Sequence, residues 1–311
     1  MTTQPVEANA TAALISDEAW AAIQGAYDLQ VHVAPDVIAR RTDDLDLARD
    51  FLAVGLRGFV LKSHYVPTAE RAQVVTRSVP GIEAYGALAL NHSVGGLNPV
   101  AVEIAGRSGN RIVWMPTVDA ANETAGRLDG GDQKLPFWAK IQREIAASGI
   151  NRPPITILDA DGHISEDTRQ CIELIAKHDM ILATGHLGRH EIFPLVTVAR
   201  ESGVQRIIIT HAEFPSQNLS AAEQLELAEM GAFIEHCFTT YHTNKATWER
   251  VFANVRHVGV ERCLLSTDLG QAANPPVAEG FGLFAQRFLD DGFAPAEINR
   301  MSAVASASLV K

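Results

Sequence analysis

Short apolar runs alternate with amphipathic stretches along almost the whole chain. Eight such runs, most of them ending in a polar or ionisable residue, occupy 26–33, 56–64, 82–92, 111–119, 180–187, 206–213, 231–238 and 262–269. Strands of a parallel sheet are covered on both faces and therefore have nearly continuous apolar sequences. The pattern predicts eight parallel strands.

The stretches between these runs have the spacing of helices. In 43–55, Leu45, Ala48 and Leu52 recur at helical intervals and a glycine ends the segment. Similar stretches occupy 67–79, 165–178, 193–203, 220–231 and 247–259. Eight strand–helix units in about 250 residues are the content of a (β/α)₈ barrel, although a doubly wound sheet contains the same elements.

The connection between the fourth and fifth runs, 119–179, is longer than the others. It contains helical periodicity at 135–148 and a predicted β-hairpin at 155–165, around the Asp161-Gly162 turn. We therefore expect an α/β protein with a TIM-like (β/α)₈ barrel, in which a helix and a β-hairpin are inserted between strands 4 and 5 as a candidate lid. We expect one domain over 1–311, with a helical extension at 1–25.

Composition and charge exclude several classes of protein. The 311 residues are 47% apolar and carry a formal net charge of -11, which argues against a nucleic-acid-binding surface. The sequence has no secretory signal pattern, and no apolar run approaches the roughly 18 residues that span a membrane. The three cysteines are widely spaced, without a CxxC pair. We expect a cytoplasmic protein that acts on a small molecule; a homo-oligomer is compatible with the sequence.

The ends of the predicted strands carry the candidate chemistry. The carboxyl ends of all strands of a barrel converge on one face, and this convergence favours the barrel over the doubly wound sheet. The residues expected there are His32, His64, His92, His186, His211, His236 and Asp268. Imidazole and carboxylate are the ligands of catalytic Zn²⁺, Mn²⁺ or Fe²⁺. His32, His186, His211 and Asp268 offer three imidazoles and one carboxylate from the first, fifth, sixth and eighth strands.

Several motifs resemble those of one enzyme superfamily in order and spacing. They are DLQVHVAPD (28–36), RGFVLKSHY (57–65), LNHSVGGLNP (90–99), VWMPTVDA (113–120), ATGHLGRHE (183–191), ITHAEFP (209–215) and STDLG (266–270). With them the sequence resembles the amidohydrolase superfamily of metal-dependent barrel enzymes, and more closely an uncharacterised family of amidohydrolase-like proteins. The resemblance implies that His32, His186, His211 and Asp268 are the metal ligands, and that Asp268 also handles the proton of the attacking water.

Gln30 departs from the superfamily pattern, because such enzymes usually carry a first histidine at this position. An amide oxygen is a weaker donor than imidazole to borderline metals. Three interpretations stay open. Gln30 is a weak ligand in a site that prefers Mn²⁺ or Mg²⁺, or a single metal is held by the other four residues, or the site no longer binds metal. If Gln30 lies outside the coordination sphere, it is a candidate for substrate binding.

Further residues are candidates for substrate binding. Lys62 and His64 alternate along the second strand and therefore share a face. Lys62 is a candidate for holding a substrate anion, and His64 for a ligand or a proton carrier. Arg40 and Arg41 follow the first strand and could bind an anion at the barrel mouth or pair with nearby aspartates. His92 and His236, at the ends of the third and seventh strands, complete the substrate-binding prediction.

The sequence predicts a metal-dependent hydrolase of a small, anionic amide, lactone or ester. Zn²⁺ is the expected cofactor and Mn²⁺ the alternative. Asp268 would act as the general base, and His211 or His64 would polarise the scissile carbonyl. Two alternatives stay open, which are a metal-dependent non-oxidative decarboxylase on the same scaffold and a metal-free barrel that acts as a binding protein.

Overall fold

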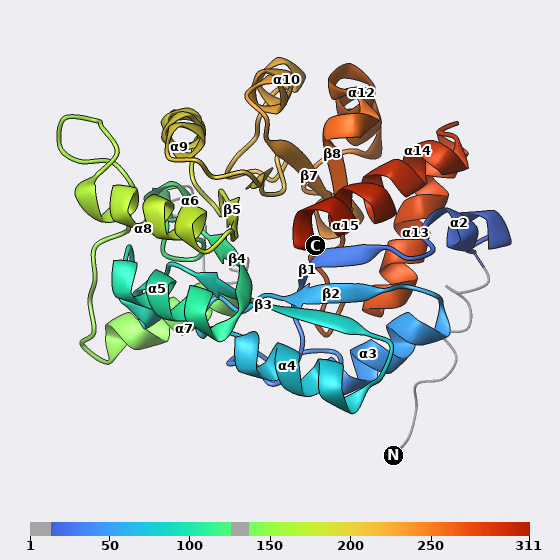
Figure 1. Cartoon of the computed structure of the whole chain (residues 1–311), viewed down its shortest axis with the longest axis horizontal. Helices are drawn as coiled ribbons and strands as arrows, with labels where there is room; N and C mark the ends of the chain where they lie inside the picture. Colours follow the sequence, from blue (N-terminus) through green and yellow to red (C-terminus); the bar gives the residue numbers. More distant parts are fainter. Residues whose placement is uncertain (1–13, 126–136) are drawn as a thin grey trace.

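A computed structural model describes residues 14–125 and 137–311 of the chain (Figure 1). Eight strands pair in parallel and in chain order, from β1 to β8. They are β1 Tyr27–Val31, β2 Gly58–Leu61, β3 Glu83–Ala89, β4 Asn110–Trp114, β5 Ile181–Ala183, β6 Ile207–Ile209, β7 Phe233–Cys237 and β8 Cys263–Ser266. Each strand lies within one of the eight apolar runs or begins one residue before it, and the predicted (β/α)₈ barrel is confirmed.

The first and last strands meet just beyond their carboxyl ends. Val31 forms a parallel bridge with Leu269, and the His32 amide donates to the Leu269 carbonyl at 2.8 Å. Deeper in the barrel, the Asp28 carboxylate accepts bonds from the Thr267 backbone N–H at 3.0 Å and from its hydroxyl at 2.5 Å. These bonds join β1 to the end of β8, so that the sheet closes on itself.

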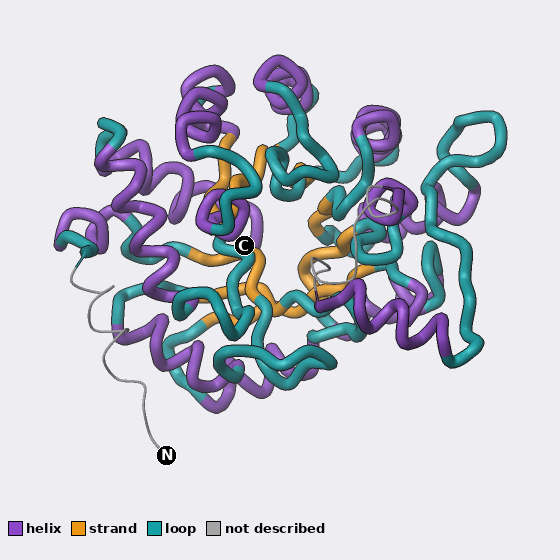
Figure 2. The backbone as a smooth tube through the Cα atoms, turned by 180° about the vertical axis from the view of Figure 1, so that it is seen from behind, coloured by secondary structure: helices purple, strands orange, loops and turns teal. Residues whose placement is uncertain are grey.

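Helices surround the strands and bury the outer face of the sheet (Figure 2). They are α2 Asp17–Ala22, α3 Asp44–Ala53, α4 Ala69–Ser78, α5 Pro99–Ser108, α6 Ala121–Ala125, α7 Phe137–Ala147, α8 Glu166–Lys177, α9 Arg189–Glu201, α10 Ala221–Glu229, α11 Phe238–His242, α12 Trp248–Val258, α13 Val277–Asp290, α14 Pro295–Asn299 and α15 Ala305–Val310. Their starts follow local rules. For example, the Asp43 carboxylate caps α3 by accepting from the Leu45 and Asp46 amides.

The carboxyl end of the chain fills one end of the barrel. Leu309 and Val310 of α15 are buried in the same apolar cluster as Leu29 and Trp114 from the strands. The Tyr27 amide, at the start of β1, donates to the Ser306 hydroxyl at 3.1 Å. Because α15 packs where the strands begin, the functional cavity is restricted to the end where the strands finish.

The insertion between β4 and β5 contains the predicted helix, now α7, although residues 135 and 136 lie outside the described part. The predicted β-hairpin is reduced to a single antiparallel bridge between Leu158 and Ile164. The Asp159 carboxylate accepts bonds from the Asp161 and His163 amides, both at 2.9 Å. Side-chain bonds of this kind compete with a strand ladder and favour a compact loop.

The N-terminal extension is described from residue 14 onward, and residues 1–13 lie outside the described part. It forms α2, which is capped by the Ser16 hydroxyl and packs against α13 and α14. Within the two described ranges, we find no helix of sufficient length and apolarity to cross a bilayer.

Candidate functional site

One cavity of about 390 Å³ lies at the carboxyl ends of the strands. Seven of the predicted site residues line it, namely His32, Arg40, Lys62, His64, His186, His211 and Asp268. They come from the ends of β1, β2, β5, β6 and β8 and from the loop after β1. The structure therefore brings together the four predicted metal ligands with Lys62 and His64.

Four imidazoles form a continuous series in this cavity. Neighbouring ring centroids lie 4.9 Å apart from His32 to His64, 6.0 Å from His64 to His186, and 4.9 Å from His186 to His211. His64 thus lies between the two halves of the predicted ligand set.

Asp268 lies beside His32, at one end of this series, and accepts two hydrogen bonds. Its Oδ1 accepts from the Gln30 amide at 2.8 Å and from His32 Nε2 at 3.1 Å. Arg40 Nη2 lies 3.4 Å from His32 Nδ1, and an arginine can only donate, so Nδ1 accepts and Nε2 carries the hydrogen. Gln30 thus contacts a predicted metal ligand, and its Oε1 is buried without a partner among the described residues.

The electrostatics favour neutral imidazoles and an ionised carboxylate. Burial, followed by the charge of Arg40, lowers the pKa of His32 to about 4; burial and His186 lower that of His211 to about 3. Burial also lowers the pKa of His186, which Glu123 partly offsets. Burial alone would raise the pKa of Asp268, but the His32 hydrogen bond and the Lys62 charge hold it well below its usual value.

Lys62 is a buried cation whose Nζ lies 5.0 Å from the centroid of the Trp114 ring. Burial lowers its pKa, while the charges of Asp268 and Glu235 raise it. Glu235, on β7, is also buried, and burial raises the pKa of its carboxyl group to about 7. The charge of Asp268 stabilises the protonated form of Lys62, so that a cation lies near the predicted general base.

Two site residues have unusual backbone conformations. His211 has a φ of 30° and Asp268 a φ of 53°, in the left-handed region that few residues other than glycine adopt. The Asp268 amide donates to the Gln30 carbonyl at 2.9 Å, and the Thr239 hydroxyl donates to the Asp268 carbonyl, also at 2.9 Å. These bonds hold the turn after β8, and they direct the carboxylate into the cavity.

The structure places His236 outside the cavity, which corrects its predicted role in substrate binding. Its ring is fully buried, and Nδ1 lies 3.1 Å from the Glu213 carboxylate. Successive side chains of a strand point to opposite faces. Because Glu235 faces the charges inside the barrel, its neighbour His236 faces the surrounding helices.

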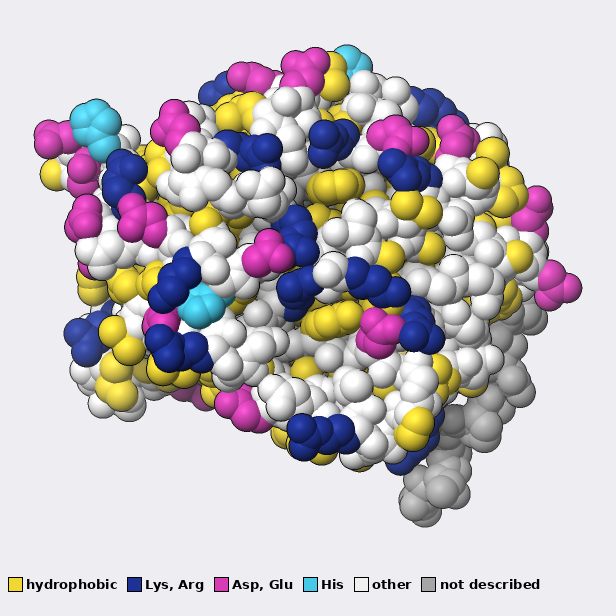
Figure 3. All heavy atoms as spheres, in the orientation of Figure 1, with side chains coloured by type: hydrophobic (Ala, Val, Ile, Leu, Met, Phe, Trp, Pro, Cys, Tyr) yellow, Lys and Arg dark blue, Asp and Glu magenta, His cyan; other side chains and the backbone are white. Residues whose placement is uncertain are grey.

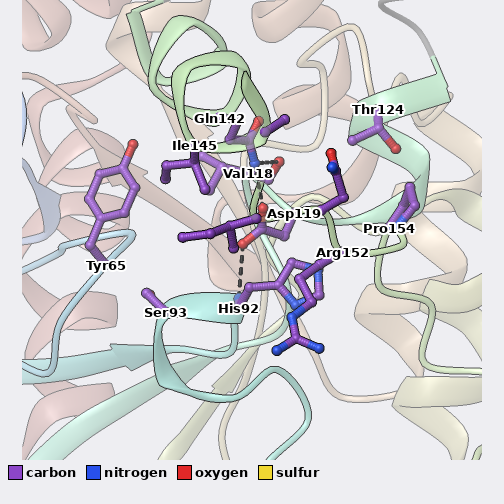
Figure 4. Close-up of a pocket in the computed structure, with 13 residues that line it drawn as sticks. Tyr65, His92, Ser93, Val118, Asp119, Thr124, Gln142, Ile145, Arg152 and Pro154 are labelled. Carbon is purple, nitrogen blue, oxygen red and sulfur yellow. Dashed lines mark hydrogen bonds between the residues drawn. The ribbon is translucent and has the colours of Figure 1, made fainter. Parts of the chain in front are cut away.

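His92 also lies elsewhere, in a second cavity of about 400 Å³ between the insertion and the ends of β3 and β4 (Figure 4). Its backbone N–H donates to Asp119, which also accepts from Gln142 of α7, and its Nε2 lies 2.9 Å from the Pro153 carbonyl. The chain turns into the short 3₁₀ helix His92–Val94 directly after β3. This turn takes His92 away from the first cavity, contrary to the prediction.

The two arginines have different positions. Arg40 lines the cavity, but its guanidinium forms a buried ion pair with Asp36 at 2.6 Å. Arg41 is not among the residues that line the cavity, and it donates to the backbone carbonyls of Ala272 and Asn274 at 3.1 and 2.9 Å. Arg41 therefore stabilises the loop after β8, which corrects its predicted contact with substrate. On the face seen in Figure 3, acidic and basic side chains are interspersed.

Three residues near the site were not predicted from the sequence. Phe214 packs against His211 and His186, with ring centroids 4.8 and 6.2 Å apart. Lys245 Nζ lies 4.2 Å from the centroid of the Phe214 ring, at the exposed mouth of the cavity. Glu123 Oε2, from α6, lies 3.2 Å from His186 Nδ1. Phe214 lies within the ITHAEFP motif and could have been considered, whereas Lys245 and Glu123 have no signal in the sequence.

The donor set fits a divalent cation in its chemistry. Neutral imidazole and ionised carboxylate are the forms that coordinate metal ions, and His211 Nδ1 is buried without a hydrogen-bond partner among the described residues. As the side chains stand, no group of three or more His, Cys, Asp or Glu residues in 14–125 and 137–311 is arranged to hold an ion. The metal role of His32, His186, His211 and Asp268 therefore stays a prediction.

Comparisons with known proteins agree with the fold. An amidohydrolase from Pseudomonas aeruginosa has a TM-score of 0.63 and 11% identity, over 94% of this chain and 97% of that chain. The probable dipeptidase PvdM from Pseudomonas aeruginosa has a TM-score of 0.61 and 13% identity, over 98% of both chains. A 2,6-dihydroxybenzoate decarboxylase has a TM-score of 0.52 and 12% identity, over 92% of this chain and 99% of that chain.

These solved structures share the barrel, as the resemblance to the amidohydrolase superfamily predicted. No protein of curated function matches the sequence. The model of one family, described as a family of unknown function (DUF6282), matches residues 25–235. The chain therefore belongs to the family of unknown function DUF6282, and its barrel is similar in fold to those of an amidohydrolase and a probable dipeptidase.

Proposed function

We propose that the protein is a metal-dependent hydrolase of a small, anionic amide, lactone or ester. The observation that carries the proposal is the convergence of three imidazoles and one carboxylate from four strand ends in one cavity. Buried polar groups are costly to retain without a use. His32, His186, His211 and Asp268 are the residues that would hold the ion, and imidazole donors favour Zn²⁺ over Mn²⁺.

A divalent cation in this cavity would lower the pKa of water from 15.7 to about 7. Asp268 would accept the proton of the attacking water and later return it to the leaving group. Its lowered pKa keeps the carboxylate ionised, and therefore able to accept a proton, at neutral pH. Phe214, half-buried beside His186 and His211, would help to keep other water away from the reacting bond.

The charges in the cavity support an anionic substrate. Arg40 is neutralised by Asp36, but Lys62 lies inside the cavity and Lys245 at its mouth. A cavity of about 390 Å³ is in the range that binds small molecules. Lys62 would hold a carboxylate of the substrate close to the reacting carbonyl, and Lys245 would attract it to the mouth.

The test begins with metal content. Protein purified without added metal is analysed for bound ions, and metal-stripped protein is then titrated with Zn²⁺ and Mn²⁺. We expect tight binding of about one ion, weakened in Asp268→Asn and unchanged in the exposed control Asp161→Asn. If none of the ions binds, a metal-free binding protein replaces the proposal.

Activity separates the proposal from the second candidate, a metal-dependent decarboxylase, which the likeness to a dihydroxybenzoate decarboxylase favours. The loaded protein is incubated with N-acyl amino acids, carboxylated lactones and carboxylated esters, and separately with hydroxybenzoates. We expect release of the hydrolysis products, abolished in Asp268→Asn. Release of CO₂ without hydrolysis would assign the second candidate instead.

A further inference from the structure

His64, just after β2, is hydrogen-bonded to two buried residues that follow the neighbouring strands β3 and β4. Its Nδ1 lies 2.9 Å from the hydroxyl oxygen of Thr117, which follows β4. Asn91, which follows β3, contacts both of them. Thr117 and Asn91 are fully buried, so every donor and acceptor of this group must find its partner within the protein.

The orientation of the Asn91 amide follows from two backbone donors. The Thr117 N–H lies 2.9 Å and the Asp119 N–H 3.3 Å from Asn91 Oδ1, which must therefore be the oxygen. The amide nitrogen then donates to the His64 carbonyl at 2.9 Å and to the Thr117 hydroxyl oxygen at 2.6 Å.

The hydroxyl of Thr117 accepts from Asn91 and still has its own hydrogen to donate. Among the described residues, the only acceptor within hydrogen-bond distance of it is His64 Nδ1. A ring nitrogen that accepts carries no hydrogen, so a neutral His64 has its hydrogen on Nε2.

We propose that Asn91 and Thr117 fix His64 as the tautomer with hydrogen on Nε2, and that this N–H donates a hydrogen bond to an oxygen of the substrate. The second half of this statement rests on the proposed function, and the first half does not. His64 lines the cavity between His32 and His186, so a bound carbonyl or carboxylate oxygen lies within its reach. In this tautomer Nε2 is a hydrogen-bond donor, and the proposal therefore assigns His64 to the substrate.

Asn91 and Thr117 are positioning residues for His64. The same group continues outward, because the Asp119 carboxylate accepts from the His92 backbone N–H and from Gln142 of the inserted helix (Figure 4). The insertion thus contacts the group that orients His64.

The tautomer is measured directly by nitrogen NMR of protein labelled with ¹⁵N-histidine, with the His64 signals assigned by their loss in His64→Gln. We expect hydrogen on Nε2 in the wild type and in Thr117→Ser, which keeps the hydroxyl. We expect Thr117→Val, which removes the donor at nearly constant volume, to lose this single tautomer.

A matched control is Thr168→Val, which removes another fully buried hydroxyl. This hydroxyl donates to the Ile157 carbonyl at 3.0 Å, and Thr168 is not among the residues that line the cavity. It should leave the His64 signals unchanged. Hydrogen on Nδ1 in the wild type, or an unchanged tautomer in Thr117→Val, would overturn the proposal.

Kinetics then test the contact with substrate. On a substrate that the wild type hydrolyses, we expect Thr117→Val to lower kcat by about 10- to 100-fold with little change in KM, since one donor to a developing oxyanion contributes about 10²–10³-fold. Thr117→Ser should restore most of kcat. An unchanged kcat in Thr117→Val would refute the role toward substrate. If no substrate is hydrolysed at all, the hydrolase proposal fails while the NMR result still decides the tautomer.

Discussion

The buried ion pair between Glu213 and His236 allows a quantitative prediction about stability. Glu213 is fully buried and accepts from Gln224 at 2.9 Å, Asn254 at 2.7 Å, Tyr241 at 2.7 Å and His236 at 3.1 Å. Burial alone would raise the pKa of Glu213, but the His236 charge and these bonds lower it to about 2. Burial would likewise lower the pKa of His236, but Glu213 raises it to about 10.

The perturbation is Glu213→Ala, which leaves a buried cation and three buried donors without their acceptor. Removing one partner of a buried pair costs about 3–5 kcal/mol. An unfolding entropy of about 2.1 cal/mol/K per residue gives about 0.65 kcal/mol/K for a chain of this length, so the melting temperature should fall by about 5–8 °C.

The dependence on pH has a definite sign. The pKa of His236 is raised in the folded state above its usual value of 6.5, so its contribution to stability is fully present below pH 6.5. That contribution is lost as the pH rises toward about 10. The pKa of Glu213 is lowered, so its contribution is present above pH 4.5 and is lost as the pH falls toward about 2. The difference between wild type and variant should therefore be largest between pH 4.5 and 6.5.

The assay is thermal unfolding of both proteins at pH 6 and at pH 9.5. Glu229→Ala, on the exposed side of α10, is the control and should change the melting temperature by less than about 1 °C at both values, as surface substitutions usually do. A difference that grows toward pH 9.5, or a melting temperature unchanged by Glu213→Ala, would refute the ion pair. It would also reopen the prediction that His236 contacts substrate.

Three further predictions concern the cavity. Asp268→Asn should lower kcat by about 10²–10⁴-fold while the protein stays folded by circular dichroism, because Asn tolerates the φ of 53° at this position; retained activity would exclude Asp268 as the base. Lys62→Met should raise KM about 10- to 100-fold for an anionic substrate, as expected for a lost charged hydrogen bond, and far less for its neutral ester; equal effects in steady-state kinetics would remove the argument for an anion. Gln30→His should bind Zn²⁺ more tightly in a titration of metal-stripped protein, since imidazole suits this ion better than an amide oxygen; unchanged affinity would place residue 30 outside the coordination sphere.

The sequence predicts the barrel well because its eight strands are buried on both faces and their apolar runs are short and regular. The same burial limits the prediction of the site. When both faces of a strand are buried, the apolar pattern does not tell which side chains point into the barrel. Glu235 and His236 are neighbours at the end of β7, and sequence reasoning chose the histidine for contact with substrate. In the structure it is Glu235 that faces the interior, whereas His236 pairs with Glu213.

Loops after the strands set a second limit. His32, His64, His186 and His211 reach the cavity because they directly follow short strands or the first turn after them. His92 also follows a strand, but the 3₁₀ turn after β3 directs it toward the insertion. Contacts such as Glu123 with His186 join segments far apart in sequence, and no local spacing encodes them.

Gln30, which stands where the superfamily usually carries a histidine, contacts the predicted general base Asp268. Its amide donates to the same oxygen of Asp268 that accepts from His32, while its own oxygen is buried without a partner in the described part of the chain. Gln30, His32 and Lys62 together stabilise the Asp268 carboxylate in the absence of a metal. A cation that bound the same Asp268 oxygen would have to displace the Gln30 and His32 donors, so each of them would lower its apparent affinity. A glutamine at this position donates to Asp268 without changing its charge with pH, whereas a histidine offers a second imidazole to the ion. We therefore expect Gln30 to favour the metal-free cavity more than a histidine would at this position, and the Zn²⁺ titration of Gln30→His measures by how much.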